Sequence, residues 1–278
     1  MKLQPRKGLV GLVLLAGLAG LAVPGVRAAD GPDQVLTTVT AVRSLSAAEA
    51  AKHYPVKLHG VVTFFDEGLF SRFIQDDTAG IYFQDLTNLP ALEPGQMVEV
   101  DGVTGPGEYA PVVIPASVTV TGQGVLPAAQ PVSAEQLASG REDSQLVVFS
   151  GLVRSVHLEK DIGFYVMDLV KGGEHFTVYA KKLPVAQPDE LVDSTVKVTG
   201  VCATMFNHQR QLFGIRLLVP SADGVVVEKP APANPFQMPA ENINSLLQFT
   251  PGGTPEDLVK VVGTVVYSEP GSALFIEN

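Results

Sequence analysis

The 278-residue sequence contains no tryptophan and a single cysteine, Cys202. One cysteine cannot form an intramolecular disulfide, and its apolar, strand-like surroundings predict a buried side chain. The five histidines show neither an HxH nor an HExxH spacing, which argues against a dedicated metal site. A GxSxG nucleophile elbow and a glycine-rich phosphate loop between a strand and a helix are also missing. We therefore predict a protein without a catalytic motif, a bound metal or a cofactor.

Basic residues are scarce, and four of them lie at the N-terminus. Lys2, Arg6 and Lys7 precede an uncharged apolar run over residues 8–23, and Val26-Arg27-Ala28 then supplies the small residues of a cleavage site. This order is typical of a secretory signal peptide, so we predict export and cleavage after Ala28. An uncleaved anchor is the alternative, although the run is shorter than the roughly 20 residues that span a bilayer.

Removal of the signal peptide makes the protein more acidic. The remaining chain has 15 Lys and Arg against 29 Asp and Glu, so the formal net charge changes from −10 to −14. A surface of this charge repels phosphate backbones unless it contains a basic groove. Nucleic acid is therefore disfavoured as a partner, and the acidity itself suits solubility outside the cell.

The chain repeats itself. Three segments, VKLHGVVTF, LVVFSGLVRSV and LVKVVGTVVYS, run through alternating apolar residues into Gly60, Gly151 and Gly263. A glycine inside a strand pattern marks a bulge or a sharp bend. A hairpin follows in the first two copies, with DDTAG and KGGE as turns. The pattern matches Ile74-Gln75-Asp76 with Val166-Met167-Asp168 and with Ile276-Glu277-Asn278, and the first two copies each continue into two further strands.

Five strands with a glycine-kinked first strand favour an OB-like barrel over a β-sandwich, which needs about seven strands. We predict an all-β protein with short connecting helices, made of tandem five-stranded OB-like barrels with the third barrel truncated. Two of the helix-like pieces, SLSAAEAAKHYP and PVSAEQLASG, place a serine ahead of a glutamate in a capping-box pattern. After the signal peptide (1–28), the predicted segments are an N-terminal linker with a short helix (29–53), barrel one (54–127), a connecting helix (128–143), barrel two (144–227), a proline-rich linker with a short helix (228–257) and an incomplete barrel three (258–278).

The blocks VKLHGVVTF…FIQDDTAGIYF and NSLLQFTPGG…LVKVVGTVVYS…LFIEN resemble the tandem OB-like repeats found outside the membrane in certain bacterial sensor proteins. In that family the repeats follow a signal peptide and precede a transmembrane segment with a histidine kinase or diguanylate cyclase module. Similar hairpins occur in OB domains attached to secreted nucleases. No kinase motif is present in this chain, so a signalling role is implied by the resemblance alone.

The Asp76-Asp77 pair is the most conspicuous polar feature. Adjacent residues on a strand point to opposite faces, and the other copies offer Asp168-Leu169 and Glu277-Asn278 at this place. A hairpin turn whose Asp side chain binds its own backbone amides therefore explains the pair better than a calcium site or an acid–base pair.

Strand alternation predicts a candidate ligand surface. If Ile74 and Ile81 face the core, the outer face of the hairpin carries Phe73, Gln75, Tyr82 and Gln84, with Tyr165 as the equivalent aromatic in the second copy. OB folds bind ligands on the face of strands two and three through stacking aromatics. The alternative is that a neighbouring domain covers these side chains.

Together these features favour an exported, non-enzymatic array of OB-like barrels. We expect the periplasmic or extracellular input region of a membrane-anchored sensor that binds a small ligand or a protein partner. A homodimer is one arrangement that the full-length protein could take. A secreted module for nucleic acid or oligosaccharide, accessory to a hydrolase or nuclease, and a scaffold without a ligand are the alternatives. The last residues, GSALFIEN, align with the middle of the first hairpin. We therefore expect 258–278 to be loosely ordered or to pair with a neighbouring barrel.

Overall fold

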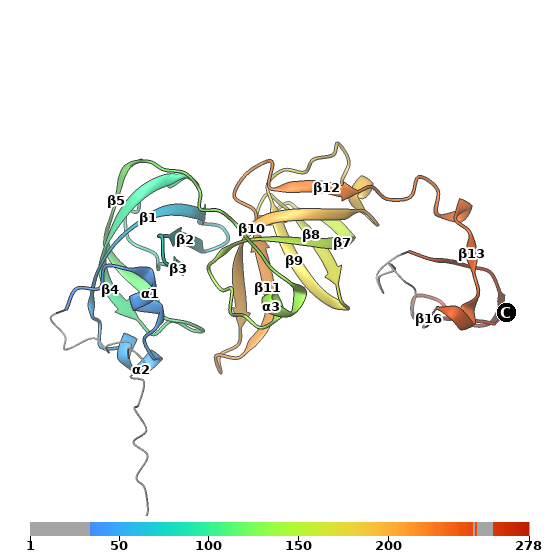
Figure 1. Ribbon diagram of the computed structural model, residues 1–278, viewed down its shortest axis with the longest axis horizontal. Coiled ribbons are helices and arrows are strands. Elements are labelled where there is room, and N and C mark those ends of the chain that lie inside the picture. Colours follow the sequence, from blue (N-terminus) through green and yellow to red (C-terminus); the bar gives the residue numbers. More distant parts are fainter. Residues whose placement is uncertain (1–33, 247, 249–257, 278) are drawn as a thin grey trace, which may run out of the picture. The chain divides into compact units, whose positions relative to one another are not determined.

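Strands dominate the chain. The computed structural model describes residues 34–246, 248 and 258–277, and about half of these lie in strands, which short helices, turns and loops connect (Figure 1). This confirms the predicted all-β class with short helices. The predicted signal peptide, residues 1–28, lies outside the described residues. Among the residues that are described, no helix has the length and apolar character needed to cross a bilayer.

The first sheet has five strands in the spatial order β3-β2-β1-β4-β5. Its strands are β1 (Pro55–Asp66), β2 (Ser71–Gln75), β3 (Gly80–Tyr82), β4 (Gln96–Gly105) and β5 (Val112–Gln123). All neighbouring pairs are antiparallel. A parallel bridge between Phe83 and Val113 joins the end of β3 to β5. The two edge strands of the sheet therefore meet at this point.

The second sheet has the order β12-β10-β11-β9-β8-β7-β6, with an additional pairing of β10 with β7. Its strands are β6 (Gln130–Pro131), β7 (Leu146–Glu159), β8 (Phe164–Lys171), β9 (Glu174–Ala180), β10 (Thr195–Phe206), β11 (Leu212–Leu218) and β12 (Val225–Lys229). The additional pairing closes β7, β8, β9, β11 and β10 into a ring. Within the ring, β9 and β11 are parallel and the other pairs are antiparallel.

The repeated glycines precede a β-bulge at the same distance in all three copies. The bulges lie two to four residues after Gly60, Gly151 and Gly263, between Val62 and Phe64, Val153 and Ser155, and Val265 and Tyr267. A Cβ at Gly60 would stand 3.0 Å from the carbonyl oxygen of Gln75 on the neighbouring strand. The predicted bend is confirmed, because glycine admits close strand approach where the bulge bends the first strand.

The predicted match of Ile74 with Val166 is wrong. Ile74 pairs with the residue just before the bulge, and in the second copy that position belongs to Leu169. In the third copy it belongs to Ile276, as predicted. The error arises because β8 is almost continuously apolar, so its sequence does not define which face points to the core.

Three short helices connect the strands: α1 (Val39–Arg43), α2 (Ala47–Ala50) and α3 (Ala134–Ala138). Each begins after a residue whose side-chain oxygen accepts a backbone N–H of the first turn, namely Thr38, Ser46 and Ser133. The complete capping box forms only at α3 among the described α-helices, and its second member is Gln136. The Glu49 side chain of α2 binds Lys52 and the Tyr54 hydroxyl.

A hydrophobic core fills the second sheet. Phe149 and Phe176 meet edge to face with their ring centroids 4.8 Å apart, and Cys202, fully buried, belongs to the same core cluster. The predicted burial of Cys202 is confirmed. Burial raises the pKa of its thiol, with a smaller contribution from Asp143.

We expect the Cys202 thiol of the folded protein to react with 5,5′-dithiobis(2-nitrobenzoic acid) at pH 8 on the order of 100-fold more slowly than in denaturant, because reaction requires opening of the core. The unfolded thiol ionises near pH 8.5 and the folded one does not, so the free energy of unfolding should also fall above that pH. Absorbance of the released thiolate measures the rate. Fast stoichiometric labelling without denaturant would contradict the assignment.

A second hydrophobic cluster joins the two sheets, which belong to one compact unit from Pro32 to Asn278. This inter-sheet cluster consists of Phe64, Leu69, Phe73, Leu146, Phe164, Val201, Ala203 and Leu218. The first three come from the β1–β2 region of the first sheet and the others from the second. Phe164 is fully buried, and its ring centroid lies 6.4 Å from that of Phe64 and 6.3 Å from that of Tyr179.

The C-terminal strands pair with one another. The turns η1 (Pro188–Leu191), η2 (Pro235–Gln237) and η3 (Ile243–Ser245) and the strands β13 (Ala240–Glu241), β14 (Lys260–Val261), β15 (Thr264–Glu269) and β16 (Ala273–Glu277) complete the described elements. β15 and β16 form a two-stranded antiparallel sheet of their own. Of the two predicted alternatives for 258–278, pairing with a neighbouring barrel is therefore wrong for the residues that the structure describes, and loose order stays a prediction. Tyr267 and Phe275 meet edge to face at 5.7 Å on this hairpin and stay exposed.

Candidate ligand-binding cavity

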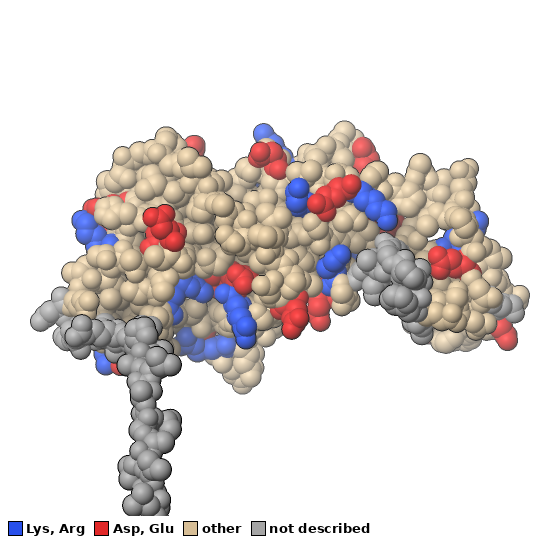
Figure 2. Space-filling model, in the orientation of Figure 1, with Lys and Arg blue, Asp and Glu red and all other residues tan. Residues whose placement is uncertain are grey.

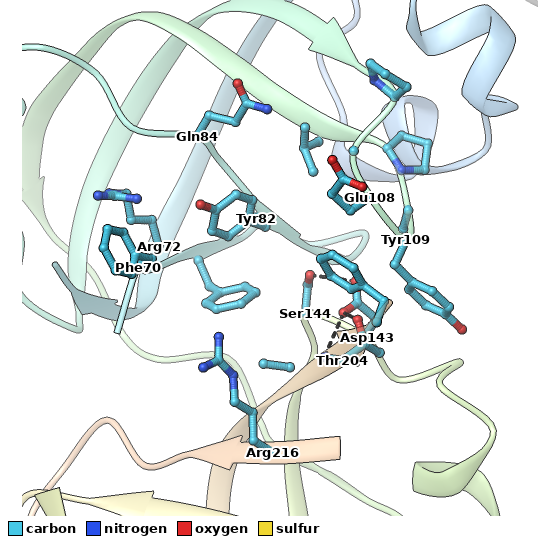
Figure 3. A pocket seen from close by; sticks show the side chains of 18 of the residues that line it. Phe70, Arg72, Tyr82, Gln84, Glu108, Tyr109, Asp143, Ser144, Thr204 and Arg216 are labelled. Atoms are coloured by element: carbon cyan, nitrogen blue, oxygen red, sulfur yellow. Dashed lines mark hydrogen bonds between the residues drawn. The ribbon is translucent and has the colours of Figure 1, made fainter. Parts of the chain in front are cut away.

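A cavity of about 590 Å³ lies where the first sheet faces the second. One wall is formed by β2, β3, the β1–β2 turn and the β4–β5 loop, and the other by β10, β11 and the residues before β7 (Figure 3). Aromatic and charged side chains share the lining, which includes Phe70, Arg72, Phe73, Tyr82, Gln84, Glu108, Tyr109, Asp143, Phe206 and Arg216. The cavity thus draws its side chains from both repeats.

Phe73 and Tyr82 are cross-strand neighbours on β2 and β3. Their rings meet edge to face with centroids 5.6 Å apart, an arrangement that fixes the orientation of both rings. Phe73 is only 4% exposed because the inter-sheet cluster covers it, whereas Tyr82 is half-buried and borders the cavity. Tyr82 is therefore the aromatic of this pair that a ligand can reach.

Phe70 stands at the end of the β1–β2 turn. Its backbone N–H donates to the Glu67 carbonyl, 3.0 Å away, and its φ of 49° lies in the left-handed region. A bulky residue rarely adopts this conformation, and such strain is concentrated at functional sites. The ring is 73% exposed. The turn thus holds an uncovered aromatic ring at the edge of the cavity.

The β4–β5 loop, residues 106–111, lines another side of the cavity. Gly107 takes a φ of 59° there, and a Cβ would collide with the Ala110 carbonyl oxygen. From the turn between β10 and β11, the Arg210 guanidinium donates to the carbonyl oxygens of Pro106 and Tyr109, at 3.1 and 3.4 Å. Burial raises the pKa of Tyr109, and the Asp143 carboxylate adds to the effect. The loop is therefore held in place from both sheets.

Two arginines line the cavity from opposite sheets. The Arg72 guanidinium on β2 is paired with Asp85 at 3.0 Å, and its side chain is 4% exposed. The Arg216 guanidinium on β11 donates to the Ser71 hydroxyl oxygen at 3.2 Å. Both Nε atoms are buried without a hydrogen-bond partner. Burial lowers the pKa of Arg216, as expected for a charge held away from water.

Asp143 is a buried carboxylate whose partners come from three parts of the chain. It accepts from the Arg43 guanidinium of α1 at 3.1 Å and from the Thr204 hydroxyl of β10 at 2.7 Å. The Ser144 hydroxyl and the Thr204 backbone N–H also donate to it, at 3.0 and 3.3 Å. With its acceptors occupied, Asp143 links helix α1, which contacts β3 and β5 of the first sheet, to β10 of the second sheet at the cavity wall.

The structure places the predicted site residues in two groups. Phe73, Tyr82 and Gln84 line the cavity. Gln75 does not: its Oε1 accepts from the Leu146 backbone N–H at 3.1 Å, so it connects β2 to the start of β7. Tyr165 packs against the core of the second sheet, away from the cavity. The predicted alternative was that a neighbouring domain covers the outer face of the hairpin. The second sheet does cover Phe73 and Gln75, whereas Tyr82 and Gln84 remain open to the cavity.

A close backbone contact accompanies the Gln75 bond. The Gly80 N–H donates to the Gln145 side chain at 3.0 Å, and a Cβ at Gly80 would collide with the Ser144 carbonyl oxygen. The β2–β3 hairpin can approach the second sheet this closely because residue 80 is glycine.

Sequence alternation missed Phe70, Arg72, Arg216 and the β4–β5 loop. Two signals were available: Arg72 directly precedes the apolar pair Phe73-Ile74, and Arg216 lies inside the otherwise apolar run IRLL. A charge in such a run indicates a partner or a polar cavity, since burying an unpaired charge is costly. The sequence does not indicate that the two runs face one cavity.

The Asp76 carboxylate organises the hairpin turn. One oxygen accepts from the backbone N–H groups of Thr78 and Ala79, at 2.8 and 2.9 Å. This confirms the predicted turn role. The other oxygen accepts from the Val39 N–H at the start of α1, at 2.8 Å, so the same residue also anchors the first helix.

No cluster of three or more His, Cys, Asp or Glu side chains suited to a metal ion occurs among the described residues. His175 lies 2.9 Å from Asp168 on the exposed edge of the β8–β9 hairpin. This pair is isolated from the cavity, since neither residue belongs to its lining.

No family model and no curated protein match the chain. Among solved structures it is similar to a putative aspartyl-tRNA synthetase from Leishmania major Friedlin, with 13% identity, a TM-score of 0.29 and coverage of 40% of this chain and 23% of that one. It is also similar to the p204 HINb domain (14% identity, TM-score 0.28, 64% and 97% covered) and to a murine DNA binding protein bound to double-stranded DNA (11%, 0.28, 63% and 99%). The chain spans about a quarter of the synthetase's length.

Proposed function

We propose that the chain is a non-catalytic binding module of tandem OB-like barrels, β1–β5 and β7–β11, with its ligand in the cavity between them. Five-stranded Greek-key barrels of this type bind ligands on the face of strands two and three and through the loops that follow strands one and four. The observation that carries the proposal is that β2, β3, the β1–β2 turn and the β4–β5 loop all line one cavity. Its volume falls within the range of small-molecule sites.

The finer proposal is a sensory role outside the cytoplasm, after export by the N-terminal signal peptide. A ligand that touches Tyr82 of one barrel and Arg216 of the other would bind differently when the barrels shift. Such a difference in affinity is what a ligand needs in order to shift a conformational equilibrium. The resemblance to sensor repeats and this placement between the barrels support the role.

Nucleic acid is the second candidate, because OB-like barrels also bind it. The formal charge of −10 argues against this candidate. On the face shown in Figure 2, several Lys and Arg side chains gather in one group at the lower left of centre with Asp and Glu side chains beside it, and elsewhere on this face the two charges alternate. A short oligodeoxythymidylate is therefore expected to bind weakly. Micromolar binding that weakens steeply with added salt would favour the nucleic-acid role.

A neutral fluorescent probe tests the cavity itself. N-phenyl-1-naphthylamine is expected to bind with a saturable rise in fluorescence, because half-buried aromatic rings exclude water from it. Tyr82→Ala and Phe70→Ala should each weaken binding about threefold to tenfold, as expected for the loss of one aromatic contact. Probe titration of the folded proteins measures this.

Tyr267→Ala serves as the matched control, because Tyr267 is an exposed aromatic on β15 outside the cavity. It should leave probe binding unchanged. Binding that does not saturate, or that all three variants reduce equally, would contradict the cavity as the binding site.

A further inference from the structure

The charges around the cavity are unequally compensated. Three carboxylates line it: Asp85 is bound by Arg72, Asp143 is bound by Arg43 and Thr204, and Glu108 is exposed. Within the described residues, Arg216 has a hydrogen bond to the neutral Ser71 and no ion pair. The cavity therefore contains one half-buried cation without a counter-charge.

A guanidinium in this position is costly to the folded protein. Removing a charge from water is unfavourable unless a counter-charge or hydrogen bonds compensate it. The Arg216 Nε–H has no acceptor, and its lowered pKa reflects the same lack of water. An anion at this place would supply both the charge and the acceptors, and a planar carboxylate or a phosphate fits the guanidinium fork.

The surroundings of Arg216 restrict the rest of the ligand. In Figure 3, Arg216 extends from β11 toward the side of the cavity where Phe70, Arg72 and Tyr82 lie. Phe70 is exposed and Tyr82 half-buried, so both rings offer apolar area next to the charge. Rings of this kind favour a flat, aromatic body.

We propose that the cavity binds a small organic anion with a flat ring, whose carboxylate or phosphate group is held by Arg216 and whose ring lies against Phe70 and Tyr82. Arg72, held by Asp85, adds a second cation to the same lining. This inference rests on the proposed function, since it names the ligand class of that cavity. It also explains why one barrel alone is an incomplete site, because the aromatics and the anion anchor come from different barrels.

The test displaces the neutral probe with 2-naphthoate, methyl 2-naphthoate and 2-naphthyl phosphate. At least one anion is expected to bind about 10-fold or more tightly than the neutral ester, the range for a hydrogen bond to a charged group. Whichever of the two anions binds more tightly identifies a carboxylate or a phosphate as the preferred group. Arg216→Gln should abolish the preference, whereas Arg154→Gln, the same change at a residue outside the lining, should preserve it.

A folding defect can be separated from a loss of the anion site. Arg216→Gln removes an uncompensated charge, so its midpoint of thermal unfolding without ligand should equal or exceed that of the wild type. In the wild type, the Nε–H resonance of Arg216 should shift on addition of the anion that binds more tightly.

If neither anion binds more tightly than the ester, or if the Arg216 Nε–H resonance does not shift, the anion site is overturned. The cavity remains supported in that case as long as the neutral probe still binds. Loss of probe binding itself would overturn the proposed function. Tighter binding of an oligodeoxythymidylate than of either naphthyl anion would replace the small ligand by nucleic acid.

Discussion

Asp143→Ala is expected to lower the free energy of unfolding by about 3 kcal/mol, the lower end of the range for breaking a buried ion pair. The lower end applies because the pair is not fully buried: the side chains of Arg43 and Asp143 are 19% and 12% exposed. The substitution leaves the Arg43 guanidinium without its counter-charge and removes the acceptor of the Thr204 hydroxyl and backbone N–H. Urea unfolding followed by circular dichroism measures the loss.

Two further variants sharpen this test. Asp143→Asn keeps an oxygen that can accept from Thr204 and loses the charge, so its loss should be intermediate. Asp101→Ala is the matched control, because the Asp101 carboxylate is exposed and lies 3.7 Å from Lys57. Its effect should stay within about 0.5 kcal/mol. Equal effects of Asp143→Ala and Asp101→Ala would show that the Arg43–Asp143–Thr204 contact does not connect the sheets energetically.

The sequence predicts those features that depend on a single strand and its neighbours. The repeated glycine and its bulge follow from the close approach that only glycine admits, as at Gly60. The Asp76 turn follows from the same local chemistry. The outer face of the first hairpin was likewise predicted from alternation, and Tyr82 and Gln84 border the cavity as that face requires.

The remaining features depend on contacts between distant segments. By strand alternation Gln75 belongs to the outer, ligand-facing side of the hairpin. Its side-chain amide oxygen instead accepts a hydrogen bond from the backbone N–H of Leu146, 71 positions away in the chain. Arg216 reaches the cavity only because β11 packs against β2, a contact across 145 positions. The predicted alignment of the second copy was wrong because β8 is apolar along most of its length, so either set of alternating side chains could face the core. Strand periodicity carries no information on how one repeat packs on the next.

Phe164→Ala is expected to have the second large effect, a loss of about 3–5 kcal/mol in the free energy of unfolding, as for other fully buried phenylalanines. The ring comes from β8 of the second sheet and packs against Phe64 of the first. Lys181 covers it, with Nζ 5.1 Å from the ring centroid and 2.8 Å from the Asp66 carboxylate of β1. A cavity at this place removes contacts from both sheets at once.

The variant should also reduce the coupling between the sheets. Because the inter-sheet cluster is shared, the wild type is expected to unfold in one transition, whereas Phe164→Ala should separate the unfolding of β1–β5 from that of β7–β12. Hydrogen exchange during urea unfolding assigns each transition to its strands. Phe213→Ala, at an exposed position of β11, is the control and should change stability by no more than about 0.5 kcal/mol. A single unaltered transition in Phe164→Ala would mean that the other contacts between the sheets, among them the Gln75–Leu146 and Arg216–Ser71 hydrogen bonds and those of Asp143, hold the two sheets together without this ring.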